Sequence, residues 1–130
     1  MREEIMKLVM IALLGFMVLA GCEQQTNADD AKKATALGGE KAMQGEFKEA
    51  INLYDKAINV NPNDAYIYFN RGAAKLNLGD FDGAIADFTK TIELNPKLKS
   101  PAYKSRAMAK RMKGDEEGAK RDMKIYYDGE

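Results

Sequence analysis

The sequence predicts an all-α protein, a solenoid of helix hairpins stacked side by side. The segment from Gly45 to Pro62 returns as Gly79 to Pro96, so both of its ends recur after 34 residues, and a weaker third copy begins at Gly114. Self-similarity at a fixed period of this length indicates stacked units that share a continuous core. Within each copy, apolar residues spaced three and four apart predict amphipathic helices.

The composition argues against catalysis. The 130 residues fit one domain, with 20 basic and 20 acidic residues, no histidine and one cysteine. The balanced charge gives no bulk attraction to nucleic acid. Histidine is the commonest neutral-pH acid–base group and metal ligand, and a lone cysteine cannot form a thiolate cluster. We therefore predict a non-enzymatic protein with no catalytic residues, metal, cofactor or small-molecule substrate.

The N-terminus carries a targeting signal. Leu8 to Ala20 is an apolar run of 13 residues, too short to cross a bilayer of about 30 Å comfortably but typical of a signal peptide. The sequence Leu19-Ala20-Gly21-Cys22 resembles the lipobox of bacterial lipoproteins. This resemblance implies a signal peptide over residues 1–21 and acylation of Cys22, with palmitate-type chains supplying membrane affinity. An uncleaved anchor or a buried helix is the alternative.

The resemblance also implies a location in the cell envelope. Residues 22–30 are polar and predict a lipidated tether, which holds the next domain near the membrane. Glu23 is not the aspartate that favours inner-membrane retention, which implies the periplasmic face of the outer membrane in a Gram-negative source. Glu3 and Glu4 offset the positive charge expected at the start of a signal, so translation from Met6 is a further hypothesis.

The first unit is predicted over residues 31–64. Its first helix ends near Gly45, and its second carries an apolar stripe that begins at Phe47. Pro62 ends that second helix, because proline cannot continue a helix and biases the residue before it out of the helical region. The candidate N-caps are Asp29 or Asp30 for the first helix and Asn63 or Asp64 for the helix that follows the unit.

The second and third units are predicted over residues 65–98 and 100–130. The second repeats the plan of the first closely. In the third, Ser100-Pro101 is predicted as N-cap and first helical residue. The third unit also departs from the pattern, with charged residues replacing apolar ones, as expected of a terminal unit that no neighbour covers. We expect residues 115–127 to form the capping helix of the stack.

The repeat resembles the tetratricopeptide repeat (TPR). The family signature is a small residue, aromatic, alanine, aromatic, alanine and proline. It is met by Gly38, Phe47, Ala50, Tyr54, Ala57 and Pro62, and again by Gly72, Phe81, Ala84, Phe88, Thr91 and Pro96, with Thr91 in place of the second alanine as the one substitution. The early leucine of the family is kept as Leu37 but becomes Arg71 and Arg106. The resemblance implies a right-handed superhelix of about three hairpins whose first helices line a concave groove.

The resemblance also implies a partner-binding groove. Its ligand-contacting positions fall, among others, on Tyr66, Phe69, Asn70, Asn77, Lys104, Met108 and Arg111. Exposed aromatics beside amides and cations suit peptide binding. The alternative for Tyr66 and Phe69 is contact with the preceding helix. A Lys/Asn clamp for a C-terminal carboxylate is incomplete here, since Thr35 and Gly39 stand at two of its places.

Residues 97–124 hold ten basic and four acidic residues. A solvated helical surface, an acidic partner and an anionic membrane all fit this excess. The sequence thus predicts a lipid-anchored module that binds peptide segments or other envelope proteins and scaffolds their assembly. The alternative is a structural subunit, docked permanently in an envelope complex or self-associating through its repeats.

Overall fold

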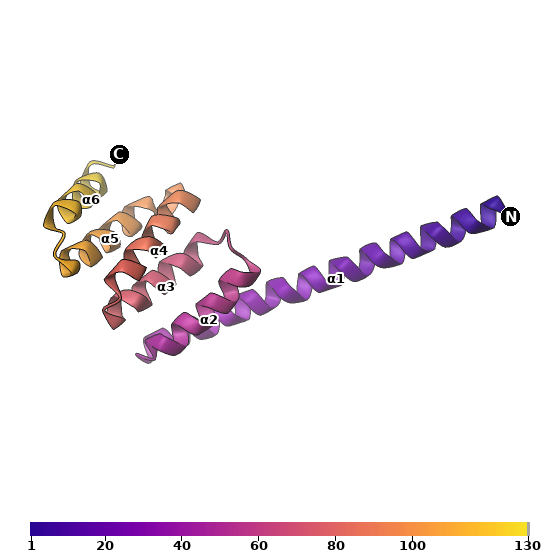
Figure 1. The fold of residues 1–130 in the computed structure, drawn as a ribbon, viewed down its shortest axis with the longest axis horizontal. Coiled ribbons are helices and arrows are strands. Elements are labelled where there is room, and N and C mark those ends of the chain that lie inside the picture. Colours follow the sequence, from indigo (N-terminus) through magenta and orange to yellow (C-terminus); the bar gives the residue numbers. More distant parts are fainter. Residues whose placement is uncertain (130) are drawn as a thin grey trace.

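A computed structural model describes the backbone of residues 1–129 and the side chains of residues 1–17 and 27–129 (Figure 1). The elements are α1 (Arg2–Met43), α2 (Phe47–Val60), α3 (Ala65–Leu78), α4 (Phe81–Leu94), the 3₁₀ helix η1 (Pro96–Leu98), α5 (Lys99–Lys113) and α6 (Glu116–Asp128). The described part of the chain contains no strand, and the predicted all-α fold is confirmed.

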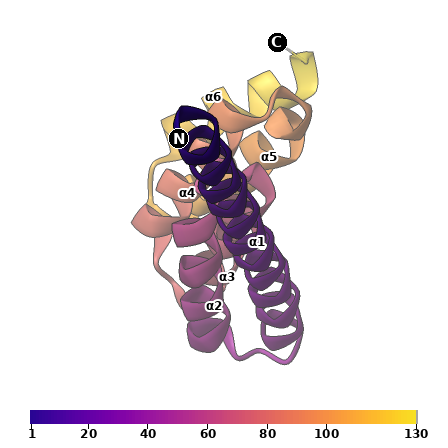
Figure 2. The same cartoon turned by 90° about the vertical axis from the view of Figure 1, so that its right-hand side faces the viewer.

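The helices form three consecutive hairpins. α1 packs on α2, α3 on α4 and α5 on α6, while α2–α3 and α4–α5 contacts join one hairpin to the next. Figures 1 and 2 show the hairpins side by side in chain order, with the first part of α1 extending away from them. Contacts also link α1 with α3 and α3 with α5, so the first helices of successive hairpins are neighbours along one side of the solenoid.

The turns follow the sequence signals closely. Gly45, Gly79 and Gly114 adopt φ angles of +79°, +81° and +97°, the left-handed conformation that ends the first helix of each hairpin. Asp64 caps α3, since its Oδ1 accepts from the Tyr66 N–H at 2.9 Å. Asp80 and Asp115 cap the second helices of their hairpins in the same way.

Two predicted helix starts were wrong. α1 begins at Arg2 rather than after Asp29 or Asp30, because no proline interrupts the sequence before Pro62 and exposed acids are tolerated inside a helix. α5 begins at Lys99, not at Pro101. Here the η1 turn leads directly into α5, and a proline in the first turn removes only an N–H that has no helical partner.

The first turns of α1 are apolar and uncovered. Ten large apolar side chains between Ile5 and Met17 are more than half exposed, from 52% for Val9 to 73% for Phe16. Among the described residues, no helix is both long enough and apolar enough to span a membrane. The predicted lipobox, Leu19 to Cys22, lies outside the residues whose side chains are described, so the signal peptide, the tether and their boundaries stay predictions.

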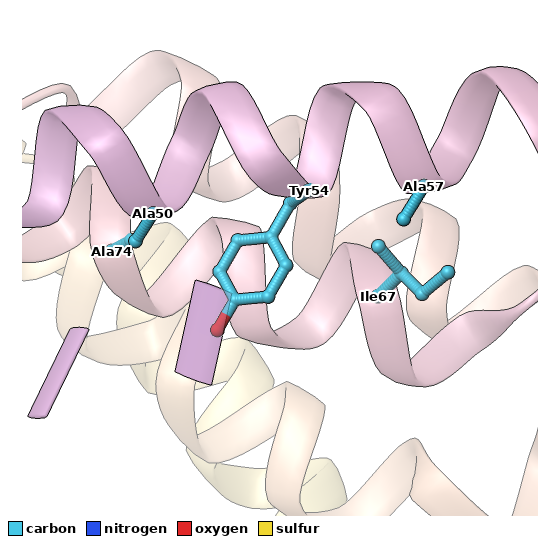
Figure 3. Close-up of a cluster of buried hydrophobic side chains, with 5 residues drawn as sticks. All are labelled: Ala50, Tyr54, Ala57, Ile67 and Ala74. Atoms are coloured by element: carbon cyan, nitrogen blue, oxygen red, sulfur yellow. The ribbon is translucent and has the colours of Figure 1, made fainter. Parts of the chain in front are cut away.

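Aromatic rings set against glycines form the core. Figure 3 shows Tyr54 projecting from α2 between Ala50 and Ala57, with Ile67 and Ala74 of α3 alongside. The ring also meets Gly38 of α1, where an added Cβ would lie 2.8 Å from Tyr54 Cε1.

The second hairpin repeats this contact. A Cβ at Gly72 would lie 3.0 Å from Cε1 of the fully buried Phe88. The helices of each hairpin approach closely because the contact residue is small, as the repeat pattern predicts.

Candidate functional site

An open depression of about 450 Å³ lies between α1 and α3, with α2 at its base. On α1 its lining residues recur every three or four positions, which places them on one face of the helix. The same spacing recurs on α3. The lining comprises Ala36, Gly39, Glu40, Ala42 and Met43 of α1, Phe47 and Tyr54 of α2, and Asn70, Ala73, Ala74 and Asn77 of α3. We call this depression the α1–α3 groove.

The α1–α3 groove combines amides, small residues and the exposed apolar side chain of Met43. Gly39 and Ala73 leave room for a chain to approach the helices closely. Asn70 and Asn77 carry both donors and acceptors, and Asn77 Nδ2 donates to the Ala73 carbonyl at 2.8 Å, which orients that amide. The Met43 side chain, at the end of α1, is 84% exposed. The groove can therefore hold an extended or helical peptide through amide hydrogen bonds and apolar contacts.

A second depression of about 780 Å³ continues the groove toward the N-terminal side. Ala36 lines both depressions. The second one is bounded by Lys32 and Thr35 of α1, Asn61 in the α2–α3 turn and Ile67 of α3. The two depressions thus form one elongated hollow along α1 and α3 rather than a single closed pocket.

The structure brings only some of the predicted groove residues together. Asn70 and Asn77 line the α1–α3 groove. Tyr66 is 58% exposed at the start of α3, outside both depressions. Phe69 is half-buried and packs on Phe88, with ring centroids 5.6 Å apart. Phe69 therefore belongs to the core cluster of the second hairpin, and it packs on α4, the helix that follows, whereas its predicted alternative was contact with the preceding helix.

The three predicted residues of α5 lie apart from this groove. Lys104 extends toward α6, where its Nζ lies 5.7 Å from the ring centroid of Tyr126. Arg111 Nε lies 3.6 Å from a carboxylate oxygen of Glu116, and Met108 is 50% exposed. These side chains form the C-terminal part of the surface and do not meet Asn70 or Asn77 in one pocket.

A buried ion pair within the second hairpin also bonds to the first hairpin, and the sequence argument missed it. Arg71 of α3 donates to both carboxylate oxygens of Asp87 on α4, at 2.9 and 2.7 Å, and to Asp55 on α2 at 2.6 Å. Asp87 is only 4% exposed and also lies 3.0 Å from Lys75 Nζ. One guanidinium thus links three helices from two successive hairpins.

The same arrangement recurs in the third hairpin. Arg106 donates to both oxygens of Asp122 at 2.8 Å, and its Nη1 donates to Thr89 Oγ1 on the preceding hairpin at 2.9 Å. Lys110 Nζ lies 2.9 Å from Asp122. Burial alone would raise the pKa of Asp122, but the hydrogen bonds from Arg106 and Lys110 outweigh it and hold the pKa below its ordinary value.

A sequence signal for these pairs does exist. Leu37 of the first unit becomes Arg71 and Arg106, and an aspartate stands 16 residues after each arginine. In the first unit the corresponding residue is Leu53. The first unit thus has leucine at both positions, whereas the second and third units have arginine at the first position and aspartate 16 residues later.

No group of three or more histidine, cysteine, aspartate or glutamate side chains that could hold a metal ion occurs in the part of the chain that the structure describes. The paired carboxylates of Asp87 and Asp122 are occupied by arginine and lysine.

Comparison with known proteins assigns the repeats. The family model described as TPR repeat matches residues 40–79, and the one described as Tetratricopeptide repeat matches residues 65–98. The chain therefore contains tetratricopeptide repeats over residues 40–98.

Curated relatives match the chain over most of its length. It is 35% identical over 108 residues to the TPR repeat-containing thioredoxin TDX of Arabidopsis thaliana, covering 80% of this chain and 28% of that protein. It is 38% identical over 101 residues to Hsc70-interacting protein 1 of Drosophila melanogaster, covering 78% of this chain and 25% of that protein. The chain thus spans about a quarter of the length of these relatives.

Solved structures share the fold. The first TPR of Spaghetti (RPAP3), bound to the HSP90 peptide SRMEEVD, aligns with a TM-score of 0.72 at 27% identity, covering 78% of this chain and 79% of that one. The MamA protein aligns with a TM-score of 0.73 at 28% identity, covering 78% of this chain and 55% of that one. The predicted solenoid of tetratricopeptide hairpins is confirmed.

Proposed function

We propose that this chain is a non-enzymatic interaction module that binds a peptide segment of a partner protein in the α1–α3 groove. The observation that carries the proposal is the groove itself. Asn70 and Asn77 line it from α3, and small residues together with the unbranched side chain of Met43 line it from α1. A similar structure, the first TPR of Spaghetti, is bound to a short peptide, which supports a peptide as the class of ligand.

The groove favours an internal segment over a C-terminal carboxylate. The carboxylate clamp of some tetratricopeptide proteins needs cations and amides from three units. Here Thr35 and Gly39 replace them in the first unit, Met108 stands at the last cation position, and Lys104 is drawn toward Tyr126. Amide pairing with a peptide backbone needs no carboxylate, so the groove suits residues within a partner chain.

A redox function does not follow from the thioredoxin relative. The matched region covers only 28% of that relative. Dithiol chemistry needs two cysteines that exchange a disulfide, and this sequence has one cysteine, Cys22. The shared part is the repeat domain.

The proposal includes lipid anchoring at Cys22 and a scaffolding role in the cell envelope. The apolar side chains from Ile5 to Met17 are exposed on all sides of the helix, an arrangement that is unfavourable in water and favours either insertion into lipid or removal with a signal peptide. Labelled palmitate should enter the wild-type chain in bacteria and not a Cys22→Ser variant. Equal labelling of both variants would contradict the anchor without affecting the groove.

A structural role is the second candidate. Met112 is 58% exposed and Tyr127 75% exposed at the C-terminal end, which favours permanent docking or self-association. Sedimentation over a hundredfold range of concentration separates the candidates. Mass that rises with concentration supports self-association, and a constant monomer mass supports a module that awaits a partner.

Selection from a random peptide display library tests the groove directly. Peptides enriched on the full chain should lose binding to an Asn70→Ala/Asn77→Ala variant. They should keep binding to the control Asn52→Ala/Lys56→Ala, which alters exposed residues of α2 outside both depressions. Failure to enrich any peptide, or equal binding to both double variants, would overturn the proposal.

A further inference from the structure

The outer face of α6 occupies the place in the repeat that receives a helix in the first two hairpins. On α2, Asp55 accepts from Arg71 of α3, and on α4, Thr89 accepts from Arg106 of α5. Ile51, Ile58 and Ile85 flank these acceptors and pack against the two core clusters. At both internal junctions, therefore, a polar residue of the second helix accepts from an arginine of the next helix, at a position that isoleucines flank in the sequence.

The repeat register maps this receiving row onto α6. The matching sets are Ile51, Ile85 and Lys120; Asp55, Thr89 and Lys124; and Ile58, Ile92 and Tyr127. Lysine thus stands where the arginine acceptor stood, and a second lysine replaces the first isoleucine. Lys120, Lys124 and Tyr127 are all exposed.

The outer face of α6 differs from the polar surface expected at the end of a repeat stack. A terminal unit needs only a polar outer face for solubility, yet this row keeps a large aromatic residue. Tyr127 is 75% exposed, and its ring lies edge-on to Tyr126 with centroids 5.1 Å apart. Lys120 is paired with Glu117 at 2.9 Å, whereas Lys124 stands one helical turn before Tyr127. The exposed ring of Tyr127 and the charge of Lys124 combine apolar area with positive charge, which is the composition of a binding surface rather than of a cap.

We propose that this face binds an acidic amphipathic helix of a partner protein. Arg71 and Arg106 occupy the centre of the incoming helix at the two internal junctions, so a third arginine would face Lys124 and be repelled. A glutamate or aspartate at that place pairs with Lys124 instead. By analogy with Ile67 and Ala74, the partner carries an apolar residue four positions before the acid and an alanine-sized residue three positions after it.

A second copy of this chain does not meet that description. The first helix of this chain carries Lys33, Leu37 and Glu40 at the places of Ile67, Arg71 and Ala74. It therefore presents a cation at the apolar place and no acid at the centre. Charge complementarity favours a different protein over end-to-end stacking of identical chains.

Two matched helical peptides test the proposal on the full chain. Both have the sequence of residues 65–78 and are cross-linked on the opposite face to hold the helix, one native and one with Arg71→Glu. We expect the glutamate peptide to bind about tenfold more tightly by fluorescence anisotropy, because one substitution turns repulsion into attraction. The preference should reverse in a Lys124→Glu chain and persist in a Lys56→Glu control, which changes an exposed lysine of α2.

Circular dichroism of each variant confirms that the helices are intact. Equal binding of the two peptides, or the same preference in the wild-type and Lys124→Glu chains, would overturn the proposal. Self-association that Lys124→Glu abolishes would assign the face to a second copy and overturn it as well. Binding to anionic phosphatidylglycerol vesicles that Lys124→Glu abolishes, without any peptide preference, would assign the face to a membrane.

Discussion

Arg71 and Asp87 form a bidentate pair across the second hairpin, at 2.9 and 2.7 Å, at positions where the first hairpin carries Leu37 and Leu53. The same fold therefore tolerates either an apolar pair or an ion pair at this place. The ion pair is costly to break, because removal of one member leaves a charge in a poorly solvated position. It also fixes orientation, since the planar guanidinium can meet two carboxylates from different hairpins at once.

Single and double replacements separate these effects. Asp87→Leu leaves Arg71 and Lys75 without their buried partner and should lower the free energy of unfolding by about 3 kcal/mol. Arg71→Leu/Asp87→Leu restores the apolar pair of the first unit and should recover most of that loss. Urea denaturation followed by circular dichroism measures both. A double variant no more stable than Asp87→Leu alone would contradict the expected recovery, and the double variant compared with the wild type gives the net contribution of the pair.

Neighbouring glycines of α1 should respond in opposite directions to alanine. At Gly38 an added Cβ would lie 2.8 Å from Tyr54 Cε1, whereas at Gly39 the nearest atom is Tyr54 Oη at 4.0 Å. Gly38→Ala should destabilise by about 1–3 kcal/mol through overpacking. Gly39→Ala should stabilise by about 0.5–1 kcal/mol, since alanine favours the helix. Urea midpoints that shift the same way in both variants would refute the close contact.

Asp122 should make the fold sensitive to acid. Burial opposes its charge, but Arg106 and Lys110 hold its folded-state pKa below the ordinary value. A carboxylate with a lowered pKa contributes stability that is complete above its unfolded pKa of about 3.9 and is lost as the pH falls through the folded-state pKa. The free energy of unfolding should therefore decline below about pH 4, and less steeply in Asp122→Asn. Identical slopes in the two proteins would contradict this contribution.

Replacement of Phe69 and of Tyr66 by alanine should affect the stability of the fold differently. Phe69 packs on the fully buried Phe88 within the second core cluster, so Phe69→Ala should destabilise by about 2–3 kcal/mol through a cavity. Tyr66→Ala, at an exposed site, should change stability by less than about 0.5 kcal/mol. Thermal unfolding that ranks Tyr66→Ala as the more damaging change would contradict the packing.

Much of the fold could be predicted from the sequence because its signals are local and repeated. Gly45 and Gly79 ended the first helices of their hairpins as expected. Asp64, one of the two residues predicted to cap α3, is its cap. The start of α1 could not be predicted in this way, because no residue before Asp29 distinguishes a polar tether from a continuing helix.

The site was harder to predict than the fold. Asn70 and Asn77 were assigned to the groove from their places on the first helix, and they line it. Lys104 shares that register, but its long side chain reaches Tyr126, which a helix position alone does not reveal. The arginine–aspartate pairs depend on contacts between hairpins, and only a comparison of all three units at both positions would have indicated them.

Nuclear magnetic resonance of the isotope-labelled full chain with a display-selected peptide tests the central claim most directly. If the α1–α3 groove is the binding site, the backbone amide signals of Gly39, Ala73 and Asn77 should shift on titration, while those of Asn52 and Lys56 on α2 stay in place. Shifts concentrated on α2, with the groove signals unchanged, would contradict the account.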